Sequence, residues 1–154
     1  MLQQTFDQLR ELRLGGCVAA LKEQLENQKY QELSFDERLA MIVEREHLLR
    51  HNRRLARNLK QARLKQQASI EELDFETSRG LKRTQVLELA GGGWIERKQN
   101  LFVVGPTGVG KTYLACALAA KAVRSGKQAL YAKTSELLSD AALARADGSF
   151  RSSL

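Results

Sequence analysis

The sequence has few of the residues that interrupt helices or crosslink chains. Its 154 residues include one proline and two cysteines, and aromatic side chains make up only 6%. A single proline leaves long helices possible. Cys17 and Cys116 lie far apart and form no CxxC pair, so we expect two free, buried thiols in a reducing compartment. This composition favours a helix-rich cytosolic protein over a disulfide-stapled secreted domain.

Long apolar runs are missing as well. No run approaches the roughly 18–20 residues that span a bilayer, and the N-terminus lacks the basic start and apolar segment of a secretory signal. The chain is nevertheless 43% hydrophobic, which is enough for a packed core. We therefore expect a soluble, cytoplasmic protein that has no membrane partner.

Acidic residues are scarce in one stretch of the chain. Residues 38–65 contain nine basic side chains and two acidic ones, whereas the remainder of the chain is neutral. The whole net charge of +7 therefore lies in this segment. Such a local excess of positive charge predicts a polyanionic partner.

The basic stretch belongs to a predicted long helix. Ser34-Phe35-Asp36-Glu37 has the capping-box pattern, and the chain then continues without glycine or proline to about Gln67. At about 100° per residue, one face of this helix carries Leu48, Leu55 and Leu59. The opposite face carries five cations, and Arg63 lies off its centre; the five are Arg50, Arg53, Arg54, Arg57 and Lys60.

Three environments could explain this cationic face: a nucleic acid, solvent alone, or an acidic protein. Opposite charges are almost absent after Glu46, so pairing along the helix does not account for it. Aromatic residues do not interleave the arginines, so base stacking is not indicated. We favour contact with the phosphate backbone of double-stranded DNA, largely independent of base sequence.

A second pattern lies in the C-terminal half of the chain. Leu101–Val104 reads as a short buried strand, and a helix rich in alanine and leucine begins directly after residue 112. The turn between them fits G-x-x-x-x-G-K-[ST] at every fixed position. Its residues are Gly105, Pro106, Thr107, Gly108, Val109, Gly110, Lys111 and Thr112.

The chemistry of phosphate binding explains the spacing of this loop. Backbone N–H groups can surround a polyphosphate only where side chains do not obstruct them. Gly105, Gly108 and Gly110 remove that obstruction and allow positive φ. The following helix directs its free N–H groups and positive dipole end at the phosphates. Lys111 adds a charge for the β- and γ-phosphates and is the candidate catalytic residue, while Thr112 offers a hydroxyl to Mg²⁺.

The remaining patterns predict the fold class. Gln128–Lys133 is a second expected strand, which with Leu101–Val104 gives a βαβ unit of parallel strands. Further helices are expected at Leu2–Leu14, which Gly15-Gly16 ends, and at Cys17–Lys29, Leu81–Ala90 and Ser135–Ala146. We therefore predict an α-helical N-terminal domain followed by an incomplete α/β P-loop NTPase domain. The predicted ranges are 1–70 for the helical domain, 71–100 for a linker with entry helices, and 101–154 for the NTPase part.

Two segments together resemble a known family. Residues 92–126, GGWIERKQNLFVVGPTGVGKTYLACALAAKAVRSG, with LLSDAALARADGS after them, resemble the IstB-like ATPases. These are helper proteins of a class of bacterial insertion sequences and relatives of the DnaC-type helicase loaders. Residues 32–64 are similar to the helical domain that precedes the ATPase in that family. The resemblance implies an AAA+ ATPase that binds ATP, assembles as a homo-oligomer on target DNA when full length, and cooperates with the transposase of its element.

The same resemblance implies that the acidic Mg²⁺ strand, the sensor residue and the arginine finger follow Leu154. The chain would then be an N-terminal fragment, and whether it hydrolyses ATP by itself is left open. Two other functions fit the residues. One is a helicase-loader relative that acts in replication, and the other is a non-catalytic DNA-binding module from a decayed element. A measured ATP affinity separates the last from the other two.

Overall fold

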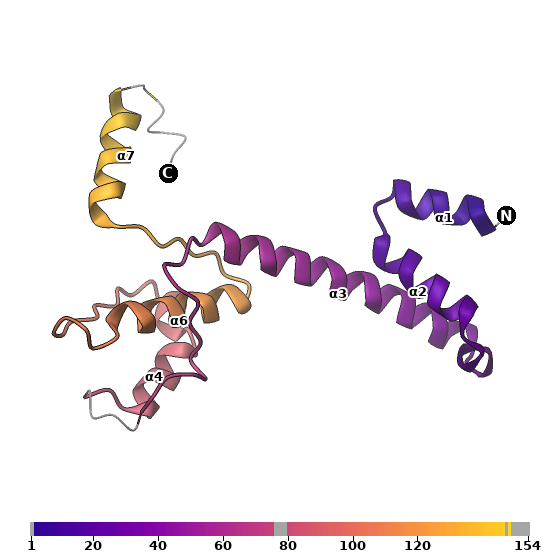
Figure 1. Cartoon of the computed structure of the whole chain (residues 1–154), viewed down its shortest axis with the longest axis horizontal. Helices are drawn as coiled ribbons and strands as arrows, with labels where there is room; N and C mark the ends of the chain where they lie inside the picture. Colours follow the sequence, from indigo (N-terminus) through magenta and orange to yellow (C-terminus); the bar gives the residue numbers. More distant parts are fainter. Residues whose placement is uncertain (1, 76–79, 147, 149–154) are drawn as a thin grey trace. The chain divides into compact units, whose positions relative to one another are not determined.

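The computed structural model describes residues 2–75, 80–146 and 148, and every regular element within them is a helix (Figure 1). Residues 76–79 of the predicted linker, and 147 and 149–154 of the predicted NTPase part, lie outside the described residues. The elements are α1 (Leu2–Glu11), α2 (Gly15–Glu26), η1 (Gln28–Glu32), α3 (Phe35–Gln61), α4 (Arg83–Ala90), α5 (Gly93–Glu96), α6 (Lys111–Arg124) and α7 (Thr134–Ala146). The chain forms two compact units, Met1–Ala56 and Arg57–Leu154.

In the first unit, α2 packs antiparallel to the first half of α3 (Figure 1). Gly16 lies against Glu46, and further along, the Gln24 side-chain amide donates to the Arg38 carbonyl at 2.9 Å. A Cβ at Gly16 would lie only 2.7 Å from the Cα of Glu46, so glycine lets the two backbones approach. The expectation that Gly15-Gly16 ends the first helix is wrong, because these residues begin α2.

The ends of α3 show which boundaries are set locally. The predicted capping box is confirmed: Ser34 N donates to Glu37 Oε2 at 2.8 Å, and Glu37 N donates to Ser34 Oγ at 3.3 Å. The helix ends at Gln61, earlier than the expected end near Gln67. Arg63 takes a left-handed conformation with φ of 48°, which turns the chain out of the helix.

The second unit is built around α6, whose buried side chains form one core with residues from the chain before α4 and from α4 itself. This core consists of Ala68, Ile70, Val86, Leu114, Cys116, Ala117 and Leu118. Val86 of α4 and Cys116 of α6 are fully buried, which shows how closely the two helices pack. Cys116 and Cys17 are free and buried, as predicted.

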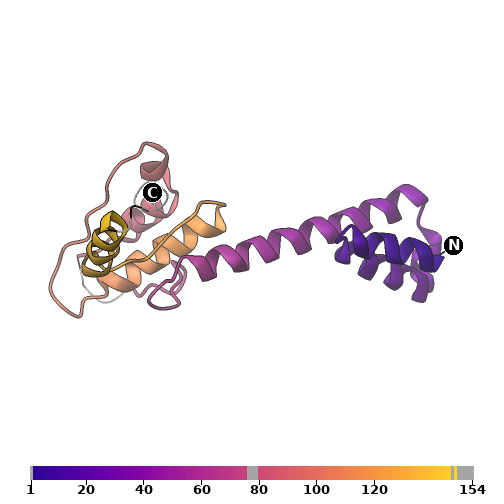
Figure 2. The same ribbon diagram turned by 90° about the horizontal axis from the view of Figure 1, so that it is seen from above.

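The two expected strands do not form among the described residues. Both views show Leu101–Val104 and Gln128–Lys133 as irregular chain between helices (Figures 1 and 2). Leu101 and Tyr131 anchor these segments on the core, but Phe102 is 83% exposed and Val104 is 91% exposed. A strand requires hydrogen bonds to a neighbouring strand, whereas Tyr131 N donates to the Ala62 carbonyl near the end of α3 at 2.8 Å. The prediction of parallel strands is therefore not confirmed here.

Candidate functional site

The phosphate-loop pattern forms a turn that leads directly into α6. Gly108 and Gly110 have φ values of 87° and 93°, which residues with a Cβ rarely adopt. Gly110 is the residue that precedes the first turn of α6, so the loop ends where the helix has its free N–H groups. These two glycines use the positive φ that glycine allows, whereas Gly105 does not. A Cβ at Gly105 would meet only ordinary contacts, the nearest being Val109 Cγ2 at 3.5 Å.

Lys111 turns its side chain back onto the loop. Its Nζ donates to the Gly105 carbonyl at 2.8 Å and also to the Pro106 carbonyl. The ammonium group is therefore held against the backbone that a phosphate would approach, with two neutral acceptors that an anion can replace. Thr112 follows in the first turn of α6 and is partly buried.

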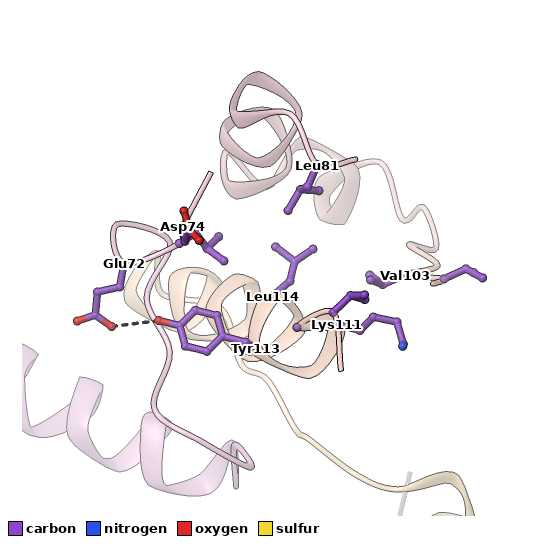
Figure 3. A pocket seen from close by; sticks show the side chains of 11 residues that line it. Glu72, Asp74, Leu81, Val103, Lys111, Tyr113 and Leu114 are labelled. Carbon is purple, nitrogen blue, oxygen red and sulfur yellow. Dashed lines mark hydrogen bonds between the residues drawn. The ribbon is translucent and has the colours of Figure 1, made fainter. Parts of the chain in front are cut away.

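A cavity of about 250 Å³ adjoins the loop (Figure 3). Gly110 and Lys111 form its border on the loop side. Most of its other walls are apolar, and they come from the segment before α4, the chain before the loop, the loop itself and α6; they include Leu73, Leu81, Val103, Val109 and Leu114. Ligand sites commonly combine such apolar walls with a few polar groups at one end. A mostly apolar cavity therefore lies beside the charged phosphate loop.

Tyr113 was not singled out by the sequence patterns, yet it joins α6 to the segment before α4. Its hydroxyl donates to Glu72 Oε2 at 3.1 Å (Figure 3). It also accepts from Ser69 N at 3.4 Å. The aromatic ring packs on the core. A tyrosine directly after the loop, at the start of an apolar helix, carries a hydroxyl that requires a partner, and this was the available signal. Tyr113 thereby fixes the chain beside the cavity.

The cationic face of α3 is mostly exposed. Arg53, Arg54, Arg57 and Lys60 are all exposed. None of these four side chains forms an ion pair with a carboxylate among the residues that the structure describes. These cations are therefore free to meet an external anion.

Arg50 differs from the other four predicted residues. Its Nε donates to Glu46 Oε1 at 2.7 Å, one turn away on α3. Pairing along the helix, which was not expected to account for this face, therefore does account for one of its five cations, Arg50. The guanidinium side chain remains 58% exposed, but part of its charge is already compensated.

Glu46 is the buried carboxylate of the first unit. While Oε1 accepts from Arg50, Oε2 accepts from Gly16 N at 2.6 Å and from Cys17 N at 3.3 Å, at the start of α2. The hydrogen bond from Arg50 lowers the pKa of Glu46 most, and the two backbone donors lower it further against the opposing effect of burial. Glu46 thus caps one helix while pairing with a cation on its own helix.

No helix among the described residues is long and apolar enough to cross a membrane. The same part of the chain contains no group of three or more His, Cys, Asp or Glu side chains that could hold a metal ion. The only metal ligand that the sequence patterns indicated is the Thr112 hydroxyl.

Comparison with known proteins gives one consistent match. The family model described as IstB-like ATP binding protein matches residues 7–154. An ATP-binding protein of insertion sequence IS1162 from Pseudomonas fluorescens is 47% identical over 151 residues, covering 97% of this chain and 65% of that protein. An insertion-sequence ATP-binding protein of Sinorhizobium fredii is 41% identical over 146 residues, covering 95% of this chain and 60% of that protein. The chain therefore spans less than two thirds of the length of these curated relatives.

Proposed function

Because the chain belongs to the family of IstB-like ATP-binding proteins of insertion sequences, we propose that it is an ATP-dependent, DNA-binding helper of bacterial DNA transposition. The observation that supports ATP binding is the complete loop Gly105–Thr112, which leads into α6 through two glycines of positive φ. The family's α/β NTPase fold agrees with that loop. In that fold Leu101–Val104 and Gln128–Lys133 would pair as parallel strands.

The loop residues suit ATP by their chemistry. Backbone N–H groups around Gly108 and Gly110, together with the start of α6, would bind the phosphates. Lys111 would exchange its carbonyl acceptors for phosphate oxygens. Thr112 would give its hydroxyl to Mg²⁺, which neutralises phosphate charge when bound. The apolar cavity beside Lys111 would receive the uncharged part of the nucleotide.

The DNA half rests on the exposed cations of α3. Arg53, Arg54, Arg57 and Lys60 would neutralise backbone phosphates and release counterions, which binds duplexes of any sequence. Arg50 would contribute less, because Glu46 already compensates its charge. By analogy with the family, the partners would be double-stranded DNA, the transposase of the same element and further copies of the protein, in the cytoplasm.

A calorimetric titration with MgATP tests the nucleotide half. Lys111→Ala removes the charge that faces the phosphates, and charge-assisted hydrogen bonds contribute roughly 1.5–3 kcal/mol each. We expect the ATP affinity to fall about ten- to a hundredfold. Lys127→Ala is the matched control, because Lys127 lies after α6 and pairs with Glu96 at 3.9 Å. Equal ATP affinity in Lys111→Ala and the wild type would refute the loop assignment.

A further inference from the structure

A basic hollow lies in the second unit, and its lining shares only Glu72 with the cavity beside the phosphate loop. It has a volume of about 590 Å³ and is formed by the end of α3, the segment 63–69 and the last two turns of α6. The buried residues Ala68 and Ala120 lie in its lining, together with the partly buried Leu59 and Leu64. These apolar groups form the buried part of the lining, and polar side chains form the remainder.

The charges around the hollow are predominantly positive. Its lining includes the cations Lys60, Arg63 and Arg124 and a single carboxylate, Glu72. Glu72 Oε2 accepts from the neutral Tyr113 hydroxyl at 3.1 Å, so its negative charge remains and offsets one of the three cations. Among the residues that the structure describes, no ion pair joins any of the three cations to a carboxylate. The amide side chains of Gln66 and Gln67 add neutral donors.

One nearby carboxylate could reduce this positive field. Glu71 lies next to the hollow, and the hydroxyl of Ser69 lowers its pKa most, with smaller contributions from Lys121 and Arg124. Lys121 pairs with Glu71 at 3.8 Å and is itself outside the lining. Glu71 therefore interacts with both cations, but its ion pair is with Lys121, and Arg124 forms no ion pair with it.

The hollow also includes one cation of the α3 face. Lys60 belongs to both, and Arg57 precedes it by one turn within the same compact unit. A duplex carries one negative charge per roughly 1.7 Å of its axis, so a backbone that contacts Lys60 presents further phosphates within reach of neighbouring cations. Two arginines beside Lys60, in a concave site with amide donors, have the chemistry to bind them.

We propose that this basic hollow binds the sugar–phosphate backbone of double-stranded DNA and extends the contact from Arg57 and Lys60 across the same compact unit. Arg63 and Arg124 are its phosphate-binding residues, and Arg63 therefore matters more than its place off the centre of the α3 face indicates. The inference rests on the proposed DNA-binding function. It adds a second surface to that function and assigns two residues that the helical periodicity left out.

The test is a fluorescence-anisotropy titration of a labelled duplex at several salt concentrations. The variant is Arg63→Asn combined with Arg124→Gln, because asparagine tolerates the left-handed backbone at residue 63. The control is Arg97→Gln combined with Lys127→Gln, which removes the same charge from the same unit outside the hollow. Thermal unfolding and ATP affinity, measured on each variant, verify that the second unit is folded.

We expect the hollow variant to lower the slope of log affinity against log salt by roughly 2, with the control unchanged. If the two variants behave alike, the hollow does not contact DNA and the inference is wrong. If Arg53→Gln with Arg57→Gln lowers the slope while the hollow variant does not, DNA binds α3 alone. If the wild type fails to bind the duplex, the proposed DNA-binding function itself is refuted. Binding to heparin with no binding to duplex would identify a general polyanion site and overturn the inference.

Discussion

Glu46 shows how one side chain can organise a packing contact. Its two carboxylate oxygens accept hydrogen bonds from Arg50 on α3 and from two backbone N–H groups at the start of α2. The side chain is only 9% exposed, so the desolvated charge needs all three donors. Removing the charge leaves these donors without a strong acceptor, which is why the residue should matter for stability.

We predict that Glu46→Gln lowers the free energy of unfolding by about 1–3 kcal/mol at neutral pH. The folded-state pKa of Glu46 lies below its ordinary value of 4.5. Its stabilisation is therefore present above that ordinary value and is lost as the pH falls through the folded-state pKa. Urea unfolding of both proteins between neutral and acidic pH should show the difference shrinking in acid. A difference that does not change with pH would contradict the carboxylate's role.

The paired glycines at the start of α2 give a matched comparison. A Cβ at Gly16 would lie 2.7 Å from Glu46 Cα, whereas at Gly15 the nearest atom is Leu49 Cδ2 at 4.0 Å. Gly16→Ala must push two backbones apart and should cost about 1–3 kcal/mol. Gly15→Ala should be neutral or stabilise the helix by up to about 1 kcal/mol. Thermal unfolding of the two single variants tests the contact, and equal effects would contradict it.

At the scale of elements, short sequence patterns correctly predicted the features that depend on neighbouring residues alone. The Ser34–Glu37 capping box starts α3 as expected, and the loop Gly105–Thr112 leads into α6. Non-local contacts escaped prediction, because the partners of Gly16 and Tyr113 lie 30 and 41 residues away. The expected strands are not confirmed for a related reason, since apolar runs identify a strand but not the neighbour that must pair with it.

The irregular segment Leu101–Val104 leads to a prediction about stability. Phe102 is 83% exposed, so Phe102→Ala should change the free energy of unfolding by less than about 0.5 kcal/mol. Val86 of α4 is fully buried in the core that α4 forms with α6. Val86→Ala should lower the free energy of unfolding by about 1–3 kcal/mol because it leaves a cavity. Chemical denaturation of both variants provides the measurement. A loss of about 3–5 kcal/mol for Phe102→Ala would show that this side chain is buried in solution.

At the scale of the whole molecule, the two proposed activities rely on separate residues. The phosphate loop lies in the second unit, and the cations of α3 lie on both sides of the division after Ala56. The predicted domain ranges remain a prediction. Composition located the positive charge correctly, but it could not show that Arg50 is paired while Arg53 and Arg57 are exposed.

This separation predicts independent losses of function. Arg53→Gln with Arg57→Gln should lower the slope of log DNA affinity against log salt by roughly 2 and leave ATP affinity unchanged. Arg50→Gln should lower the slope by less than about 1, the change expected for one unpaired cation, because Glu46 compensates its charge. Anisotropy titrations and calorimetry on the same preparations decide this. A parallel loss of ATP binding would show that the variants disturb the fold instead.

The two buried thiols allow local opening of the protein to be measured by chemical labelling. Each compact unit contains one of them, Cys17 in the first and Cys116 in the second. Burial raises the pKa of Cys17, which further slows its reaction with a thiol reagent while the unit is closed. Labelling followed by peptide mass analysis therefore times the opening of both units in one sample, without an introduced label. Bound MgATP should slow the labelling of Cys116 and leave that of Cys17 unchanged.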